Sequence, residues 1–206
     1  MSDLSYPIGK FEWSGTLTPA ERRRMIEQIA ETPAKFRAAV AGLTPKQLDT
    51  PYRPGGWTVR QLIHHVPDSH LNAYIRLKLA LTEVQPTIKP YEQQLWAELA
   101  DSKHTPVETS LAMLEALHDR WVVLLRTLAP EDFERLLVHP EQSAPLPVDW
   151  LIALYSWHGA HHTAHVTALR DRMGWKAKAG ARKPKAKGRL SSHHKHKAKP
   201  RKSRRK

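Results

Sequence analysis

Apolar residues recur every three to four positions along four long stretches of the chain, a spacing that places them on one face of an α-helix. The stretches cover residues 18–43, 58–83, 107–128 and 148–173. No stretch alternates between apolar and polar residues as a half-buried strand does, although a small strand pair in the loops stays open. The pattern predicts an all-α fold, a four-helix bundle that runs up and down with a long crossover.

Local signals mark the ends of these helices. Thr18 precedes a proline and Glu21, which is an N-cap and first-turn pattern. Thr58 and Gln61 form a T-x-x-Q capping box. Gly174 follows the last stretch, at the position that glycine favours after a helix. We therefore expect the long helices to begin and end close to these residues.

Prolines divide the rest of the chain. Pro130 ends the third helix, whereas Pro33 is expected to kink the first helix or to restart it with Thr32 as a second N-cap. The segment 84–106 contains three prolines. We expect this segment to wrap the outside of the bundle, with a short helix near residues 92–99.

The net charge of +13 is divided unevenly along the chain. Residues 176–206 hold 15 of the 33 Lys and Arg and none of the 20 Asp and Glu, and every Trp, Tyr and Phe lies before them. The acidic residues of 1–175 therefore slightly outnumber the basic ones. We expect one domain, residues 1–175, followed by a disordered Lys/Arg-rich tail, residues 176–206.

The absence of cysteine excludes a disulfide framework, a thiolate metal site and a cysteine nucleophile. The N-terminus has no apolar run typical of a signal peptide, and no window reaches the ~18 to 20 apolar residues of a membrane span. We expect a soluble cytoplasmic protein without a membrane partner.

Histidines gather in two clusters, HHVPDSH at 64–70 and HGAHHTAH at 158–165. Two histidines four residues apart on a helix lie on the same face, where both rings can bind one ion at about 2.0–2.1 Å. The second cluster offers two such pairs. They are His158 with His162 and His161 with His165.

Helical periodicity distinguishes the pairs, because a buried metal ion must face the interior of the bundle. With Leu151 at zero, the apolar stripe lies between about 0° and 60°, and His162 and His158 fall near 20° and 340°. His161 and His165 fall toward one flank, at roughly 280° and 320°. The first pair is therefore the better candidate, and the second pair suits a boundary or an outer shell.

A third ligand is expected from the cluster at 64–70, because two imidazoles leave an ion under-coordinated. On the wheel of that helix, His64 lies opposite the apolar face, His65 lies at its flank and His70 lies inside it. Pro67 removes a helical hydrogen bond and can bend the segment. The spacing alone leaves the third ligand open.

Three long strings of the sequence resemble the YfiT-type branch of the DinB superfamily. They are DTPYRPGGWTVRQLIHHVPDSH, YIRLKLALTEVQPTIKPY and ALYSWHGAHHTAHV, and the similarity runs through nearly all of residues 4–175. The resemblance implies one divalent metal per chain, Zn²⁺ or Ni²⁺, bound by His65, His158 and His162. It also implies a homodimer. Pro67 departs from the family pattern, in which a small residue stands at this position, two residues after His65.

The resemblance implies an enzyme with a small-molecule substrate. Members of the family are described as metal-dependent hydrolases or as bacillithiol S-transferases. Three neutral imidazoles leave a coordination position open, and a metal ion there can activate water for hydrolysis. The alternative is transfer of a low-molecular-weight thiol to an electrophile. Asp68 and His161 are candidates for proton transfer or for orienting a ligand, whereas His64, His70, His104, His118 and His139 are expected to have structural roles.

The basic tail supplies a third hypothesis, a non-enzymatic nucleic-acid-associated protein. Clustered cations neutralise phosphates with little sequence preference, although the tail has no aromatic residues for base stacking. A disordered appendage that aids solubility is the alternative. The candidate contacts are Lys183, Lys185, Lys187, Arg189, Arg201, Lys202, Arg204 and Arg205.

Overall fold

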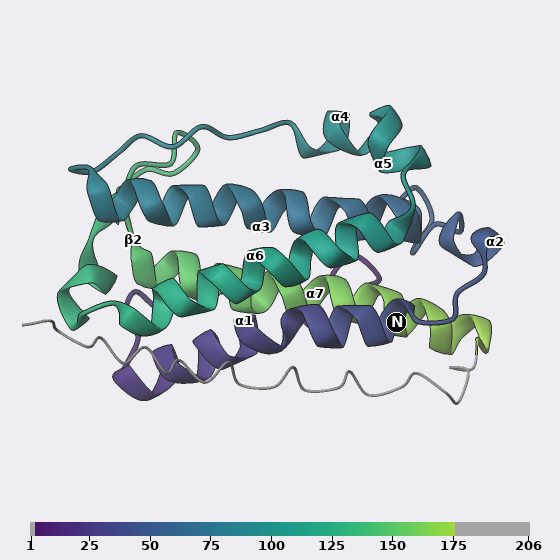
Figure 1. The fold of residues 1–206 in the computed structure, drawn as a ribbon, viewed down its shortest axis with the longest axis horizontal. Helices are drawn as coiled ribbons and strands as arrows, with labels where there is room; N and C mark the ends of the chain where they lie inside the picture. The colour runs from purple at the N-terminus through teal and green to yellow at the C-terminus, as the bar shows by residue number, and fades with distance from the viewer. Residues whose placement is uncertain (1–2, 176–206) are drawn as a thin grey trace, which may run out of the picture.

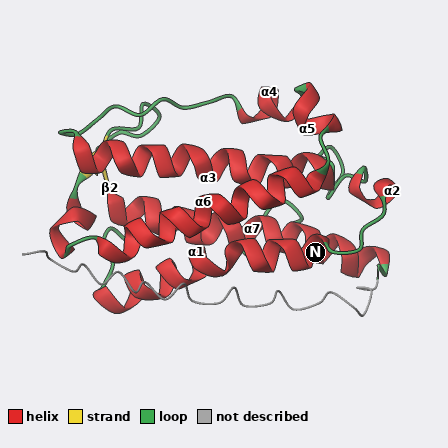
Figure 2. Ribbon diagram, viewed as in Figure 1, coloured by secondary structure: helices red, strands yellow, loops and turns green. Residues whose placement is uncertain are grey.

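Four long helices lie side by side in the computed structural model, which describes residues 3–175 (Figures 1 and 2). They are α1 (Pro19–Val40), α3 (Val59–Thr82), α6 (Val107–Thr127) and α7 (Val148–Met173). In Figure 1, α1 and α7 run in one direction and α3 and α6 in the other, because the connection from α3 to α6 returns along the whole bundle. The predicted four-helix bundle with a long crossover is confirmed.

Short elements occupy the connections between the long helices. They are α2 (Pro45–Leu48), α4 (Gln93–Ala97), α5 (Ala100–His104), the 3₁₀ helix η1 (Pro130–Glu134) and the antiparallel strands β1 (Leu136–Leu137) and β2 (Leu146–Pro147). Helices α4 and α5 pack against α3, so the crossover covers the outside of the bundle as expected. It holds two short helices, where the sequence predicts one.

The helix ends follow the local signals. Thr18 Oγ1 accepts from the Glu21 backbone at 3.3 Å, and the Glu21 carboxylate accepts from the Thr18 backbone at 2.9 Å. Thr58 and Gln61 make the same reciprocal pair at 3.1 and 2.9 Å. Gly174 ends α7 with φ of 64°, a left-handed conformation that glycine adopts without steric cost.

Pro33 does not restart the first helix, so of the two predicted alternatives, a kink or a restart, the restart is wrong. Helix α1 continues through it, and Thr32 Oγ1 donates to the Gln28 carbonyl at 2.9 Å instead of capping a new helix. Proline has no N–H, so it leaves the Ile29 carbonyl, four residues earlier, without its helical donor. Instead, Nδ1 of the His118 ring forms a hydrogen bond with that carbonyl at 2.7 Å. A contact from α6 therefore replaces the hydrogen bond that Pro33 removes.

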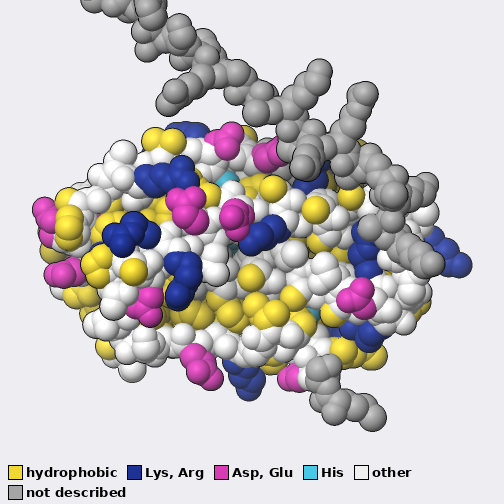
Figure 3. Space-filling model, turned by 90° about the horizontal axis from the view of Figure 1, so that it is seen from below, with side chains coloured by type: hydrophobic (Ala, Val, Ile, Leu, Met, Phe, Trp, Pro, Cys, Tyr) yellow, Lys and Arg dark blue, Asp and Glu magenta, His cyan; other side chains and the backbone are white. Residues whose placement is uncertain are grey.

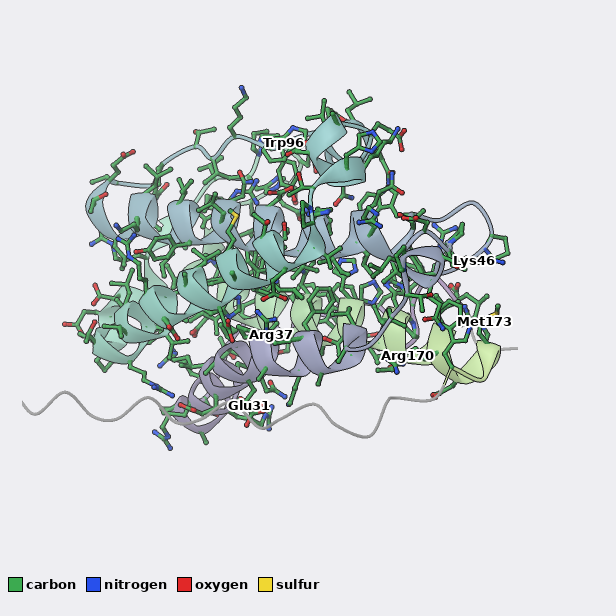
Figure 4. The ribbon with its side chains drawn as sticks, turned by 45° about the vertical axis from the view of Figure 1, so that its right-hand side comes forward. Glu31, Arg37, Lys46, Trp96, Arg170 and Met173 are labelled. Atoms are coloured by element: carbon green, nitrogen blue, oxygen red, sulfur yellow. The ribbon has the colours of Figure 1, made fainter. Side chains whose placement is uncertain are left out.

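Charged side chains link the helices at their margins. Arg22 on α1 forms a two-bond ion pair with Asp149 on α7, with both distances 2.7 Å. Arg37, which Figure 4 labels on α1, forms an ion pair with Glu108 on α6 at 2.7 Å. Arg170 on α7 donates to the Ala39 carbonyl near the end of α1 at 2.8 Å, where a cation also complements the helix dipole.

The surface of the described domain carries both signs of charge. Figure 3 shows Lys and Arg side chains mixed with Asp and Glu over the face it presents. None of the described helices is long and apolar enough to cross a membrane. The basic tail and its eight candidate nucleic-acid contacts lie outside the described residues.

Helices α1 and α7 approach each other closely at Gly159. A Cβ atom at this position would lie 2.6 Å from Thr32 Cγ2 and 2.7 Å from Thr32 Oγ1. Both atoms belong to a β-branched side chain that is buried and hydrogen-bonded to its own helix. The absence of a side chain at Gly159 therefore sets the distance between α1 and α7.

Gly159→Ala tests this contact. Overpacking costs about 1–3 kcal/mol, whereas alanine gains only about 1 kcal/mol over glycine within a helix. We expect the free energy of unfolding to fall by roughly 1 kcal/mol in urea denaturation. In a Thr32→Ala background only the Cβ atom of residue 32, at 3.2 Å, stays close, so the same substitution should cost much less. Equal destabilisation in both backgrounds would contradict this explanation.

Candidate metal centre

The structure brings together the three predicted metal ligands. His65 projects from α3, and His158 and His162 lie one turn apart on α7. One ring nitrogen from each of the three lies within 4.8 Å of the others. The Nε2 atoms of His158 and His162 are 3.1 Å apart, and the His65 ring centroid lies 5.0 Å from that of His162.

Pro67 does not separate His65 from the other two ligands. Helix α3 is continuous through Pro67, which is buried, and His65 stays on the side of α3 that faces α7. The Trp57 ring packs against the His65 ring, with centroids 4.7 Å apart. The departure from the family pattern at Pro67 is therefore compatible with a third ligand at His65.

Burial keeps these imidazoles neutral. Removal from water, with a smaller effect of His161, lowers the pKa of His65 from 6.5 to about 4. Burial, followed by the neighbouring histidines, lowers the pKa of His158 and His162 well below 6.5. A neutral imidazole has a free lone pair, which is the form that binds metal ions.

The spacing of the ring nitrogens fits a divalent ion. Two nitrogens that each lie about 2.0–2.1 Å from one ion are roughly 3 Å from each other. His158 and His162 already meet this condition. Imidazole nitrogen is a ligand for both Zn²⁺ and Ni²⁺, so the donor set allows both metals.

A second group of three histidines, His161, His162 and His165, also has ring nitrogens within 4.8 Å of one another. Both nitrogens of His165 already have partners, the Ser5 carbonyl at 3.2 Å and His162 Nδ1 at 3.4 Å. The group that contains His65 is therefore the better candidate for a metal centre.

A cavity of about 300 Å³ lies beside the three ligands. Aromatic rings of Tyr52, Trp57 and Trp157 form part of its wall. Among the described residues that line it, Arg53 carries the only permanent charge, and none is Asp or Glu. The cavity is therefore large enough for a small molecule and has a positive electrostatic character.

The structure places the two candidates for proton transfer differently. His161 lines the cavity and stacks on Trp157 with centroids 4.2 Å apart, and burial lowers its pKa to about 4. Asp68 lies on α3 outside the cavity lining, and no hydrogen bond between described residues joins it to His65. Burial, followed by the charge of Asp101, raises the pKa of Asp68 to about 6. Only His161 is positioned to contact a molecule in the cavity.

Two histidines without an expected role at the site lie directly behind it. His70 Nε2 is 3.1 Å from His158 Nδ1, and His70 Nδ1 is 2.8 Å from His118 Nε2. His70 and His118 are 0 % and 2 % exposed. The sequence places them on different helices, so no spacing rule indicates their contact. His64 instead bonds to Ser110 at 2.7 Å.

Acid should unfold the metal-free protein as histidines become protonated. Burial lowers the pKa of His65 and His118 from 6.5 to about 4. Between these values the unfolded chain binds protons that the folded protein excludes, so stability is complete above about pH 6.5 and falls toward pH 4. We expect each such histidine to steepen the loss by about 1.4 kcal/mol per pH unit.

Urea denaturation with a chelator at pH 7.5, 6 and 5 measures this loss. His118→Gln should lower by about one the number of protons taken up on unfolding, and so make the free energy of unfolding depend less steeply on pH. A free energy of unfolding that stays constant from pH 7.5 to 5 would contradict the burial of neutral imidazoles.

Two proteins with similar sequences carry the name of a metal-dependent hydrolase. A protein of Bacillus mycoides (strain KBAB4), named "putative metal-dependent hydrolase", is 55% identical over 175 residues, which are 85% of this chain and 100% of the relative. A protein of Bacillus cereus (strain 03BB102) with the same name is 54% identical over 175 residues, which again are 85% of this chain and 100% of the relative.

A solved structure has the same fold. YfiT from Bacillus subtilis, described as "a probable metal-dependent hydrolase with an unusual four-helix bundle topology", matches with a TM-score of 0.82 and 48% identity. The match covers 84% of this chain and 99% of that one. The family model of the DinB superfamily matches residues 28–166. The resemblance found in the sequence is confirmed, and the chain belongs to the DinB superfamily.

Proposed function

We propose that the protein is a metal-dependent hydrolase in which His65, His158 and His162 bind one Zn²⁺ or Ni²⁺ ion. The observation that carries the proposal is the convergence of three neutral ring nitrogens within 4.8 Å at the wall of a cavity. The names of the relatives from Bacillus mycoides and Bacillus subtilis support it.

A bound ion on three imidazoles would supply Lewis acidity for activating water and polarising a substrate oxygen. The residues of the chain supply the remaining requirements. His161 is neutral at pH 7 and faces the cavity, so its ring can accept a proton from the attacking molecule. Arg53 can bind a negatively charged group of the substrate.

One observation favours a second candidate function, the transfer of a small thiol to an electrophile. The described lining of the cavity contains no carboxylate, the usual base that takes a proton from water in a metallohydrolase. A positive cavity lowers the pKa of a thiol, and the thiolate then needs no strong base. The absence of cysteine is compatible, because the thiol arrives with the cosubstrate.

Metal content tests the proposed ligands. Protein purified without a nickel column should contain about one divalent ion per chain by elemental analysis. His158→Ala combined with His162→Ala should abolish binding, and His65→Ala should weaken Zn²⁺ binding by more than the roughly 10–100-fold typical of outer-shell changes.

His64→Ala is the matched control, because His64 is equally buried on α3 but bonds to Ser110. It should keep the ion. Stoichiometric metal in the double variant would refute the ligand assignment.

Substrate assays separate the two reactions. If the protein is a hydrolase, the metal-loaded form should cleave members of a panel of esters and amides without added thiol. If it is a transferase, adducts should form only when cysteine, bacillithiol or a similar thiol is supplied with monobromobimane.

Arg53→Gln should raise KM for anionic substrates by roughly tenfold, the effect of losing about 1.4 kcal/mol, with little change for neutral ones. Thiol-dependent adducts without any hydrolysis would exclude the hydrolase proposal.

A further inference from the structure

A column of hydrogen-bonded rings crosses all four long helices. It begins at the Ile29 carbonyl on α1, which lies 2.7 Å from His118 Nδ1 on α6. His118 Nε2 lies 2.8 Å from His70 Nδ1 on α3. His70 Nε2 lies 3.1 Å from His158 Nδ1 on α7. We call His118, His70 and His158 the imidazole column.

The carbonyl at the start of the imidazole column fixes the position of every proton in it. A neutral imidazole has one N–H donor and one acceptor nitrogen, whereas a carbonyl oxygen only accepts. His118 must therefore donate from Nδ1 to Ile29, which leaves its Nε2 to accept from His70 Nδ1. His70 Nε2 then accepts from His158 Nδ1. The column consequently leaves His158 Nε2 without a proton, and its lone pair has only a long contact with Ser69 Oγ, at 3.5 Å, besides the one with His162.

A shorter path fixes His162 in the same way. His165 Nε2 is 3.2 Å from the Ser5 carbonyl, so this nitrogen carries the proton. His165 Nδ1 is therefore the acceptor for His162 Nδ1, at 3.4 Å. His162 Nε2 is left with a free lone pair, as in His158.

These two lone pairs face each other at 3.1 Å. Neither nitrogen has a proton to donate to the other, so their approach is electrostatically unfavourable without a cation between them. The orientation of both rings thus suits a cation and does not suit a hydrogen bond within the pair.

We propose that His70, His118 and His165 are positioning residues, which fix the proton positions of His158 and His162 so that both Nε2 atoms are free for metal before the ion arrives. This inference rests on the ligand set of the proposed function. Partners that hold the second nitrogen of a metal-bound histidine set its orientation and its affinity for the ion. Here two of these partners are imidazoles, and each path ends on a carbonyl.

Pro33 gives the imidazole column its starting point. Because residue 33 has no N–H, the Ile29 carbonyl does not form the usual helical hydrogen bond and is available to His118. The column is also closed to proton transfer at its Ile29 end, because a carbonyl cannot release a proton. The column therefore orients His158 and does not conduct protons from the site.

The proton positions can be measured directly in the metal-free protein. Long-range ¹H–¹⁵N NMR spectra at pH 8, with ring-labelled histidine, distinguish a proton on Nδ1 from one on Nε2. We expect Nδ1–H for His70, His118, His158 and His162, and Nε2–H for His165. A proton on Nε2 of His158 would overturn the proposal. Absence of metal binding by the unaltered protein would instead refute the proposed function, so the two failures are distinguishable.

Two substitutions of His118 separate hydrogen bonding from packing. His118→Phe keeps an aromatic ring but removes the acceptor for His70, so we expect the His158 proton to move to Nε2 and Zn²⁺ affinity to fall about 10–100-fold. His118→Gln should keep affinity within a few-fold, because its amide oxygen accepts from His70 and its NH₂ group donates to Ile29. Chelator competition measures both affinities.

His64→Phe is the control for replacing a buried imidazole with a benzene ring, since His64 lies outside the imidazole column. It should lower stability without moving the His158 proton or the Zn²⁺ affinity. Equal affinity loss in His118→Gln and His118→Phe, or no loss in either, would overturn the proposal. If His118→Phe does not fold, His118→Gln and the spectrum of the unaltered protein still decide.

Discussion

Pairing both ring nitrogens of His70 and of His118 in the apolar interior ties the four long helices to one another. An unsatisfied buried polar group costs about 1–3 kcal/mol, so a ring with two open nitrogens would endanger a domain of ordinary stability. His70 is fully buried, and its two partners come from α6 and α7. His118 is held by α1. A shift of any one helix along the bundle would break this set of bonds, so the helix positions and the proton positions are determined together.

Two residues that weaken an isolated helix stabilise this arrangement. Pro33 removes a hydrogen bond from α1, and His118 takes the carbonyl that becomes available. Gly159 has poor helix propensity, but it lets α7 approach Thr32, the residue next to Pro33. Since Gly159 also follows His158 directly, the contact that sets the distance between α1 and α7 lies beside a candidate ligand. The local costs at both positions are therefore offset by contacts between helices.

The parts of the fold that depend on neighbouring residues could be predicted from the sequence. Thr58 caps α3 through Gln61, and Gly174 ends α7, because both signals act within one turn. The helical wheel placed His158 and His162 together for the same reason. His65 required the family resemblance, because its wheel position was ambiguous beside Pro67. The partnership of His70 and His118 could not be predicted, since it depends on how α3 packs against α6. The predicted alternative of a restart at Pro33 is wrong because His118, on a helix distant in sequence, supplies the hydrogen bond that Pro33 cannot donate.

Hydrolysis and thiol transfer both depend on the positive charge of the cavity. Water and a thiol both become nucleophiles by losing a proton, and a positive site stabilises the anion in each case. Three neutral ligands would leave the full charge of the ion uncompensated, and Arg53 adds to it. Apart from the proposed ligands and His165, His161 is the one imidazole of the described lining, so it is the candidate acceptor for that proton. The difference between hydrolysis and thiol transfer then lies in the molecule admitted. A cavity of about 300 Å³ with aromatic walls has room for an organic cosubstrate, which water alone does not require.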